Sequence, residues 1–352
     1  MNFASDNAAP VAPEIMAAIV RANEGGALAY GNDAWTQRVE RRFAEIFERD
    51  VAVFLVPTGT AANALAIAHC ALPWGAVLCH AEAHIATDEC GAPEFFGGGI
   101  KLVGLPGEGA KISAGTLERA LKERQWGGPH HVSPVVVSLS QATEAGTIYR
   151  PDELRELADL AHRHGLVLHM DGARFANALA RMNASPAEAT WRAGVDVLSF
   201  GATKGGALAA EAIVFFDPAR GSGMQDRRKR GGHLISKHRF VAAQIEAFLA
   251  DDLWLRLARH GNVMADRLGE GLEQAGFVPI WPIEANEVFV VLPQRIIDRL
   301  KSEGASFYDW SAGSLPKQVK MASDGSLVRL VASFATAQHE VDRFVTIASG
   351  RN

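Results

Sequence analysis

The chain has 352 residues, of which 48 % are hydrophobic and 21 % are charged, and its formal net charge is −5. This composition is ordinary for a soluble enzyme, and the length allows one large domain and a smaller one. The densest basic run spans only residues 227–230 and contains no aromatic residue, which argues against nucleic-acid binding. The three cysteines lack metal-site spacing and the N-terminus lacks the features of a signal peptide, so we expect a cytoplasmic protein.

Short apolar runs alternate with amphipathic helical patterns through the first 250 residues. Segment 61–79 carries no charge, but its many alanines, with Asn63 and Pro73, predict a buried helix and a strand rather than a membrane span. The alternation predicts an α/β fold in which a mostly parallel sheet is covered on both faces. The seven predicted strands are residues 51–56, 76–80, 100–104, 135–139, 166–170, 195–200 and 212–216.

The pattern changes near residue 250. Two long helical patterns, at 236–249 and 253–275, lead into a strand, a helix, a second strand and a final helix. These elements predict a small α+β domain over residues 251–352, after a large domain over residues 1–250 that includes an N-terminal arm. The later predicted elements are a strand at 287–292, a helix at 295–301 and a strand at 328–333.

Residues 57–63, with the sequence Pro-Thr-Gly-Thr-Ala-Ala-Asn, follow the first strand and open a helix. Small residues let the backbone approach an anion, and the free N–H groups of a helix N-terminus favour phosphate. Thr58 and Thr60 add hydroxyl donors. A simple N-cap by Thr58 explains the same pattern, so the motif alone leaves both interpretations open.

His84 lies just beyond the second predicted strand, where an imidazole could stack on a flat cofactor ring or move a proton. His80 and Glu82 match the His-x-Glu half of a zinc deaminase signature. The Pro-Cys-x-x-Cys half is absent, so this sequence does not predict that zinc site. A single histidine at a strand end is often structural, and the functional interpretation of His84 depends on its neighbours in the fold.

Two strand-end residues together indicate a pyridoxal phosphate site. Asp171 follows the apolar run 166–170, and Lys204 follows the run 195–198 within a segment of small residues, 33 positions later. Burying a lysine there is unfavourable unless its amine reacts or has a partner. In pyridoxal phosphate enzymes an aspartate pairs with the pyridine nitrogen and a lysine forms a Schiff base with the cofactor. Either residue alone could be an ordinary loop residue.

Two arginines are candidates for binding a substrate carboxylate. Arg174 follows Asp171 by three residues, and Arg329 stands alone in the otherwise apolar run 328–331. Arginine offers a planar, bidentate contact to a carboxylate, which suits an amino-acid substrate. A surface position is the alternative for an arginine on a strand.

With these residues assembled, the chain resembles the threonine aldolases and β-eliminating lyases, which are fold type I pyridoxal phosphate enzymes with the aspartate-aminotransferase fold. The resemblance covers nearly the whole chain, from Ser5 to the last helix. Its firmest points are Tyr30-Gly31, the segment 59–63, Ala83-His84, the run His-Met-Asp-Gly-Ala-Arg at 169–174, and the lysine segment 199–205.

The resemblance implies a pyridoxal phosphate-dependent carbon–carbon lyase. Such an enzyme cleaves L-threonine, L-allo-threonine and related β-hydroxy-α-amino acids to glycine and an aldehyde. It implies that Lys204 is the Schiff-base lysine, that Asp171 pairs with the pyridine nitrogen and that His84 stacks on the ring. It also implies that Gly59 and Thr60 bind the cofactor phosphate.

For the substrate, the resemblance implies contacts from four residues, one of which, Arg174, also contributes to the cofactor site. It implies a catalytic base that is a histidine, His84 or His131, or a water held by them. The implied assembly is a homotetramer, a dimer of dimers with shared sites, in which Arg230 and Lys237 reach a neighbour's phosphate. The implied substrate-binding residues are Ser5, Tyr30, Arg174 and Arg329.

Two segments depart from the common form of the family. The loop 230–237 replaces a glycine triplet followed by Met-Arg, and residues 140–144 replace Leu-Glu-Asn-Thr-His. These departures suggest a distinct subgroup with its own preference for the β-substituent. The alternatives to a threonine aldolase are a phenylserine-preferring aldolase, a related β-eliminating lyase or aminotransferase, and a binding protein without cofactor.

Overall fold

A seven-stranded sheet forms the centre of the larger part of the molecule. The computed structural model describes residues 1–352 except 312–314, 317–318, 320, 322–323 and 351–352. The strand order is β1-β7-β6-β5-β4-β2-β3, and β7 runs antiparallel to both of its neighbours while β2 to β6 are mutually parallel. All seven predicted strands are therefore confirmed. They are β1 (Ala52–Val56), β2 (Gly75–His80), β3 (Lys101–Leu105), β4 (Ser133–Ser140), β5 (Val167–Gly172), β6 (Val197–Gly201) and β7 (Glu211–Phe215).

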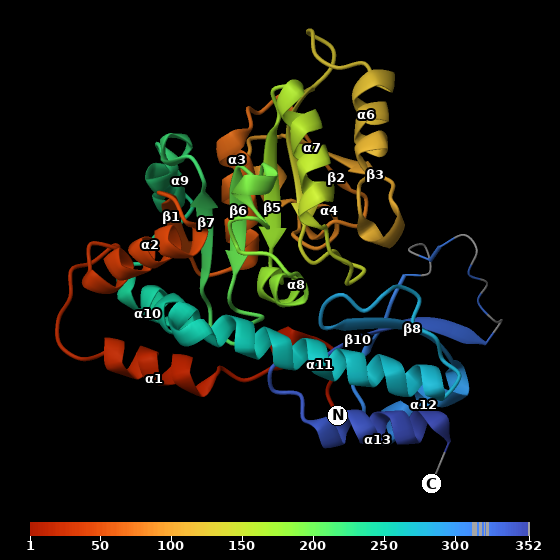
Figure 1. The fold of residues 1–352 in the computed structure, drawn as a ribbon. Coiled ribbons are helices and arrows are strands. Elements are labelled where there is room, and N and C mark those ends of the chain that lie inside the picture. The colour runs from red at the N-terminus through yellow and green to blue at the C-terminus, as the bar shows by residue number, and fades with distance from the viewer. Residues whose placement is uncertain (312–314, 317–318, 320, 322–323, 351–352) are drawn as a thin grey trace.

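Helices cover both faces of this sheet (Figure 1). Helix α3 has no charged residue and packs against the sheet with residues 61–68 all buried, as expected for a helix that is apolar on every side. Among the described residues no helix is both long and apolar enough to cross a membrane. The helices of this part are α1 (Pro13–Ala22), α2 (Ala34–Phe47), α3 (Gly59–Cys70), α4 (His84–Thr87), α5 (Ala92–Phe96), α6 (Ala114–Glu123), α7 (Pro151–Arg163), α8 (Phe175–Arg181), α9 (Met224–Arg230) and α10 (Arg239–Leu249).

A second, smaller sheet follows in the C-terminal part. It has the order β8-β10-β9, and both pairings are antiparallel. Strand β9 was not predicted, because two residues are too few to form a recognisable pattern. The predicted strand at 328–333 begins earlier and ends earlier, since β10 pairs with β8 from Gly325 to Val331. The elements are α11 (Leu253–Gln274), β8 (Glu287–Pro293), α12 (Gln294–Ser302), β9 (Tyr308–Asp309), β10 (Gly325–Val331) and α13 (Gln338–Ser349).

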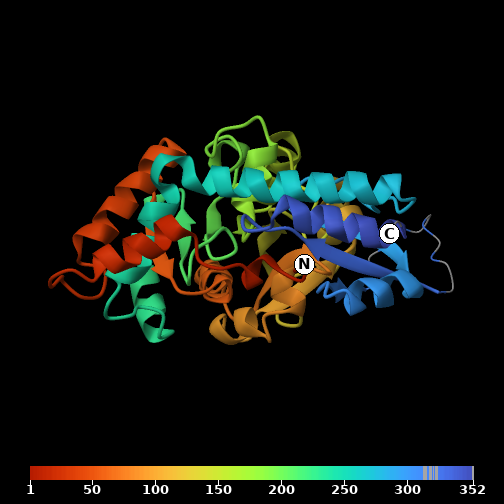
Figure 2. The same cartoon turned by 90° about the horizontal axis from the view of Figure 1, so that it is seen from below.

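The two parts are joined by α11 and by the N-terminal segment. Helix α11 passes from the helices under the large sheet to the C-terminal sheet, and both views place the N-terminus beside that sheet (Figures 1 and 2). Phe3 is fully buried in the C-terminal hydrophobic cluster, and its ring lies 5.1 Å from that of Phe344. The first residues of the chain therefore pack with the C-terminal part. The division at residue 250 stays a prediction.

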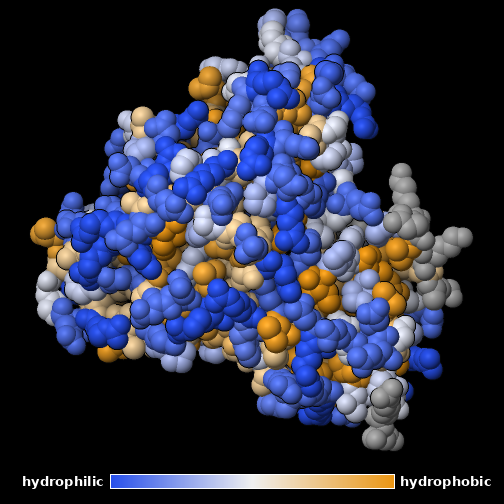
Figure 3. Space-filling model, in the orientation of Figure 1, coloured by the Kyte–Doolittle hydropathy of each residue, from blue (hydrophilic) through white to orange (hydrophobic). Residues whose placement is uncertain are grey.

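The sheet brings four chain segments to one edge. Parallel strands β4, β5 and β6 end there at Ser140, Gly172 and Gly201. Because β7 runs in the opposite direction, its first residue, Glu211, pairs with Gly201 at the same edge. Ligand sites in open α/β sheets lie at the carboxyl ends of the strands. On the face seen in Figure 3, hydrophilic side chains predominate and apolar ones form separate small patches.

Candidate active site

A cavity of about 570 Å³ opens at this edge, which is within the range of small-molecule sites. Its walls come from the ends of the central strands, the start of α3, the N-terminal segment and the C-terminal part. The structure brings eight of the predicted site residues together there. They are Ser5, Gly59, Thr60, His84, Asp171, Arg174, Lys204 and Arg329.

The other four predicted residues lie outside the cavity of their own chain. His131 is exposed in the loop before β4, at the amino end of that strand, whereas the cavity lies at the carboxyl ends. The Tyr30 N–H donates to the Ser236 carbonyl, and the Lys229 ammonium lies 4.4 Å from the Tyr30 ring centroid. Tyr30 and the loop that carries Arg230 and Lys237 therefore form one surface region. None of the four residues lines the cavity of its own chain, so their predicted roles require a second copy.

Asp171 is held in place at the floor of the cavity. Its side chain is only 7 % exposed, and its carboxylate accepts hydrogen bonds from the Ala173 N–H at 3.0 Å and from Asn63 Nδ2 at 2.8 Å. The same Asn63 nitrogen donates to Glu89 Oε1 at 2.8 Å. Asn63 thus connects two buried carboxylates, and each is fixed by a donor that belongs to α3.

His84 is oriented by Glu89. The distance from His84 Nδ1 to Glu89 Oε1 is 2.9 Å, and the Glu89 side chain is fully buried while the His84 ring is 42 % exposed. The hydrogen bond to Glu89 raises the pKa of His84, and burial opposes it. Burial raises the pKa of Glu89, with the bonds from His84 and Asn63 opposing. The pair fixes one ring nitrogen and leaves Nε2 without a hydrogen-bond partner among the described residues.

Lys204 lies in a turn that needs glycines on both sides. A Cβ at Gly201 would come within 2.7 Å of the Ala173 backbone, and one at Gly205 would come within 2.7 Å of the Phe248 ring. Gly206 has φ +124°, a conformation that other residues rarely adopt. This close packing fixes the backbone on both sides of the lysine that lines the cavity.

The start of α3 forms another wall of the cavity. Thr58 is the N-cap residue, and its hydroxyl accepts the Ala61 N–H at 3.1 Å. Thr58, Gly59 and Thr60 all line the cavity, and a Cβ at Gly59 would meet nothing within 4 Å. The cap predicted for Thr58 is therefore confirmed. It leaves the first turn of a 12-residue helix facing the cavity, where the N–H groups are suited to an anion.

The two arginines sit with two buried carboxylates. Asp6 accepts from Arg174 Nε at 2.7 Å and from Nη2 at 3.0 Å, while Glu287 Oε1 lies 3.4 Å from Arg174 Nη2 and 4.0 Å from Arg329 Nη1. Burial lowers the pKa of Arg174, but the charges of Asp6 and Glu287 hold it above its ordinary value. Burial and the charge of Arg174 lower the pKa of Arg329, and Glu287 opposes them.

Arg329 differs from Arg174 in that its Nε–H group donates no hydrogen bond to the described residues. Its guanidinium lies 4.4 Å from the centroid of the Trp310 ring, and its buried Nε has no hydrogen-bond partner among the described residues. Both carboxylate oxygens of Glu287 are likewise buried without a hydrogen bond in that part of the chain. The unpaired Nε–H of Arg329 marks a place where an acceptor group of a ligand would be stabilised, whereas Glu287 already forms ion pairs with both arginines.

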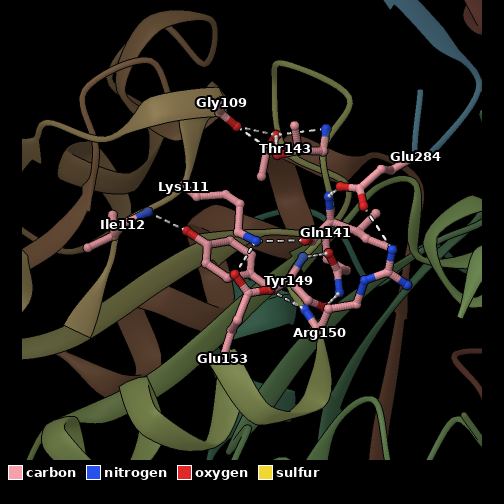
Figure 4. Close-up of polar contacts among 11 residues, drawn as sticks. Gly109, Lys111, Ile112, Gln141, Thr143, Tyr149, Arg150, Glu153 and Glu284 are labelled. Atoms are coloured by element: carbon pink, nitrogen blue, oxygen red, sulfur yellow. Dashed lines mark hydrogen bonds and ion pairs between the residues drawn. The ribbon is translucent and has the colours of Figure 1, made fainter. Parts of the chain in front are cut away.

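A loop with many internal hydrogen bonds carries Glu144 into the cavity wall. The Gln141 side chain exchanges two hydrogen bonds with the Tyr149 backbone, and the Tyr149 hydroxyl accepts the Ile112 N–H at 2.6 Å (Figure 4). Glu284, from the C-terminal part, accepts from Arg150 Nη2 at 2.8 Å and from the Ile148 N–H at 3.0 Å. Figure 4 shows that these contacts converge on the base of the loop, which therefore connects the two parts of the molecule.

Glu144 itself accepts hydrogen bonds from the Ser140 hydroxyl at 2.6 Å and from the His84 N–H at 2.9 Å. Burial raises its pKa to about 7, and those two hydrogen bonds oppose the shift. Several acidic or amide residues in the site escaped the sequence analysis, since most of their partners are distant in the sequence, and Glu89 and Glu144, whose partners His84 and Ser140 are near, belong to no recognisable motif. A charge at the start of an apolar run was the available signal for Glu211 and Glu287. The residues missed are Asp6, Asn63, Glu89, Glu144, Glu211 and Glu287.

Comparison with known proteins identifies the family. The model of the beta-eliminating lyase family matches residues 2–295. The chain therefore belongs to the beta-eliminating lyase family. The low specificity L-threonine aldolase of Pseudomonas aeruginosa is 46 % identical over 307 residues, which cover 87 % of this chain and 88 % of that protein. The enzyme of the same name from a Pseudomonas species is 43 % identical with the same coverage. Within its family, the chain belongs with the low-specificity L-threonine aldolases.

Solved structures agree with this assignment. The threonine aldolase of Leishmania major superposes with a TM-score of 0.91 at 30 % identity, covering 99 % of this chain and 98 % of that one. The serine palmitoyltransferase of Sphingomonas wittichii reaches a TM-score of 0.72 at 16 % identity, covering 99 % and 86 %, a likeness that concerns the fold alone. The predicted fold type I architecture is confirmed.

Members of this family are pyridoxal phosphate enzymes, and this chain is a pyridoxal phosphate-dependent lyase. The cavity suits that cofactor in three respects. It offers a lysine amine, a buried carboxylate fixed by two donors at Asp171, and the open first turn of α3. The phosphate site predicted from residues 57–63 and the lysine–aspartate pair thus face one space of adequate volume.

The raised pKa of Glu144 leads to a prediction about stability. Because the folded-state pKa is about 7, above the ordinary value of 4.5, the folded protein binds a proton here more tightly than the unfolded chain. Stability contributed by Glu144 is therefore present at low pH and lost as pH rises towards 7. In Glu144→Gln, which keeps the acceptor for Ser140 and His84, the free energy of unfolding in urea should fall less between pH 5 and pH 8 than in the wild type. Parallel pH profiles would contradict this account.

Proposed function

We propose that this enzyme cleaves L-threonine, L-allo-threonine and related β-hydroxy-α-amino acids to glycine and an aldehyde. The observation that carries the proposal is that one cavity holds both a candidate base and a candidate binding group for the substrate carboxylate. The base is His84, which Glu89 orients, and the binding group is Arg329, whose Nε is unpaired. The names of the Pseudomonas and Leishmania relatives support the same reaction.

The cofactor would be held by residues at the strand edge. Lys204 would bond to it covalently, Asp171 would pair with the ring nitrogen, and the first turn of α3, with Gly59 and Thr60, would bind the phosphate. Bound pyridoxal phosphate supplies an electron-withdrawing ring that accepts the electron pair of the broken Cα–Cβ bond. The Asp171 carboxylate, held by two hydrogen-bond donors, would face the ring nitrogen and favour its protonated form.

His84 would remove the proton from the β-hydroxyl. Glu89 binds Nδ1, so the neutral ring carries its proton there and presents Nε2 as the acceptor, in the way that a carboxylate orients a histidine base in other enzymes. A neutral histidine with a pKa near the working pH is an efficient general base. A water held by the histidines stays an alternative base. His131 stays another, provided that a second copy brings it to this cavity.

The substrate carboxylate would bind chiefly to Arg329. Arg174 already donates from Nε and Nη2 to Asp6, whereas the Nε of Arg329 is unpaired. Arg174 would then contribute its charge and its remaining donors, and Ser5, which lines the cavity, a hydroxyl group. Fixing the carboxylate would orient the substrate in the cavity and so select which bond of Cα breaks.

We also infer a homotetramer with shared sites. Leu208 lines the cavity and is 56 % exposed, and Tyr30 is 44 % exposed beside the loop of Arg230 and Lys237. A neighbouring copy that covered this face would bring those residues close to the cavity mouth. We also propose the cytoplasmic location that the sequence predicts.

The products decide between this reaction and its alternatives. With L-threonine we expect the purified enzyme to release glycine and acetaldehyde in equal amounts. Ammonia and a keto acid in their place would point to a β-eliminating lyase, a keto acid without ammonia would point to an aminotransferase, and either result would contradict the proposal. Comparing kcat/KM for L-threonine, L-allo-threonine and phenylserine tests the phenylserine-preferring alternative in the same assay.

The Glu89–His84 pair leads to a further prediction. In the wild type, kcat/KM should fall at acidic pH as His84 becomes protonated, and this limb should lie above the ordinary pKa of 6.5 because Glu89 raises the pKa. In Glu89→Gln the limb should move to lower pH, and kcat should fall about tenfold to a hundredfold, because the neutral amide still accepts the Nδ1 proton but no longer stabilises the protonated ring by its charge.

The matched control is Glu118→Gln, which removes one carboxylate from the exposed face of α6. Its pH profile of kcat/KM should be that of the wild type. An unmoved acidic limb in Glu89→Gln would show that His84 is not the base whose protonation limits the reaction.

A further inference from the structure

Glu211 is a buried carboxylate of the cavity that the reaction described above does not use. It is the first residue of β7, it is 6 % exposed, and it lies across from Gly201 at the end of β6. Lys204 follows Gly201 by three residues, and both Glu211 and Lys204 line the cavity. The antiparallel direction of β7 is what places this carboxylate beside the lysine turn.

The contacts of Glu211 are directed at the backbone that leads to Lys204. Glu211 Oε2 accepts the Ala202 N–H at 3.0 Å, and the hydroxyl and the N–H of Thr203 also interact with this carboxyl group and lower its pKa. The Thr203 hydroxyl in turn accepts the Ala210 N–H at 3.3 Å. The two residues immediately before the lysine, Ala202 and Thr203, thus both interact with the carboxyl group of Glu211.

The charges around Lys204 come from several elements. The Lys204 ammonium interacts electrostatically with Asp6 of the N-terminal segment, with His84 of α4 and with Glu211 of β7. Asp171 and Arg174 line the same cavity. Burial raises the pKa of Glu211 to about 7, and the Thr203 and Ala202 hydrogen bonds and the charge of Lys204 oppose the shift. Near neutral pH this carboxyl group therefore exchanges between its ionised and protonated forms.

We propose that Glu211 is a positioning residue for Lys204, which fixes residues 202–203 and, when ionised, favours the protonated form of the nitrogen that links the lysine to pyridoxal phosphate. The inference rests on the proposed role of Lys204. A carboxylate acts on a nearby cation through space, and within a buried site this effect is weakly screened. A purely structural acceptor would fix the turn without changing the proton affinity of that nitrogen.

The experiment compares Glu211→Gln with the wild type, both loaded with pyridoxal phosphate. The absorption spectrum is followed as a function of pH, since the protonated and unprotonated linking nitrogen absorb differently. Glutamine has the same shape and still accepts the backbone N–H groups, so cofactor affinity should change less than about threefold. The midpoint of the spectral change should fall by about one pH unit, because one negative charge is lost near the nitrogen.

Two variants separate positioning from charge. Glu211→Ala should show the same lower midpoint and, in addition, at least tenfold weaker retention of the cofactor on dialysis, since the turn loses its acceptor. Glu118→Gln, which removes an exposed carboxylate on α6, should leave the midpoint unchanged. An unchanged midpoint in Glu211→Gln would overturn the inference.

If neither Glu211 variant folds, Thr203→Val tests the positioning role, because it removes the hydroxyl that interacts with the Glu211 carboxyl group. It should weaken cofactor retention several-fold, and retention equal to that of the wild type would contradict the proposal. The spectrum of Lys204→Ala distinguishes the two levels of the argument. A band unchanged in that variant would reject the role of Lys204. If the band is lost in Lys204→Ala but the midpoint of Glu211→Gln equals that of the wild type, only the inference about Glu211 is rejected.

Discussion

Ionised groups in a buried cavity need a partner of opposite charge or several donors, and this constraint explains the arrangement of the site. Each cationic or basic group of the cavity is accompanied by a buried carboxyl group, which for the two arginines comes from a distant segment of the chain. Asp6 and Glu287 accompany the two arginines, Glu89 accompanies His84, and Glu211 accompanies the turn of Lys204. The cavity can thus hold a doubly charged cofactor and a zwitterionic substrate while its own side chains remain oriented.

Topology supplies these partners. The carboxyl ends of β4, β5 and β6 meet at one edge, so that residues distant in the chain become neighbours. Strand β7 runs in the opposite direction, and its first residue therefore lies where the other strands end. The N-terminal segment packs against the C-terminal part through Phe3, and this contact carries Ser5 and Asp6 to the arginines. Both parts of the molecule must therefore be in place before the carboxylate site is complete.

The sequence predicted much of this arrangement, because the informative signals were local. Seven apolar runs indicated seven strands, and Asp171 and Lys204 were recognisable as polar residues at strand ends. The carboxylates that accompany them were not predicted, since pairs such as Asp6 with Arg174 or Glu287 with Arg329 depend on contacts between distant segments. Strand β9 is too short to leave a pattern. The roles implied for Arg230 and Lys237 concern a neighbouring copy, and those implied for Tyr30 and His131 require one, since neither residue lines the cavity of its own chain.

The most direct test of this account is to locate the covalent attachment of the cofactor. The enzyme loaded with pyridoxal phosphate is reduced with borohydride and digested, and its peptides are examined by mass spectrometry. We expect the added mass on one peptide, at Lys204, and none in Lys204→Ala treated in the same way. Modification at another lysine, or no stable modification after loading, would contradict the assignment of Lys204 and with it the role of the cavity around it.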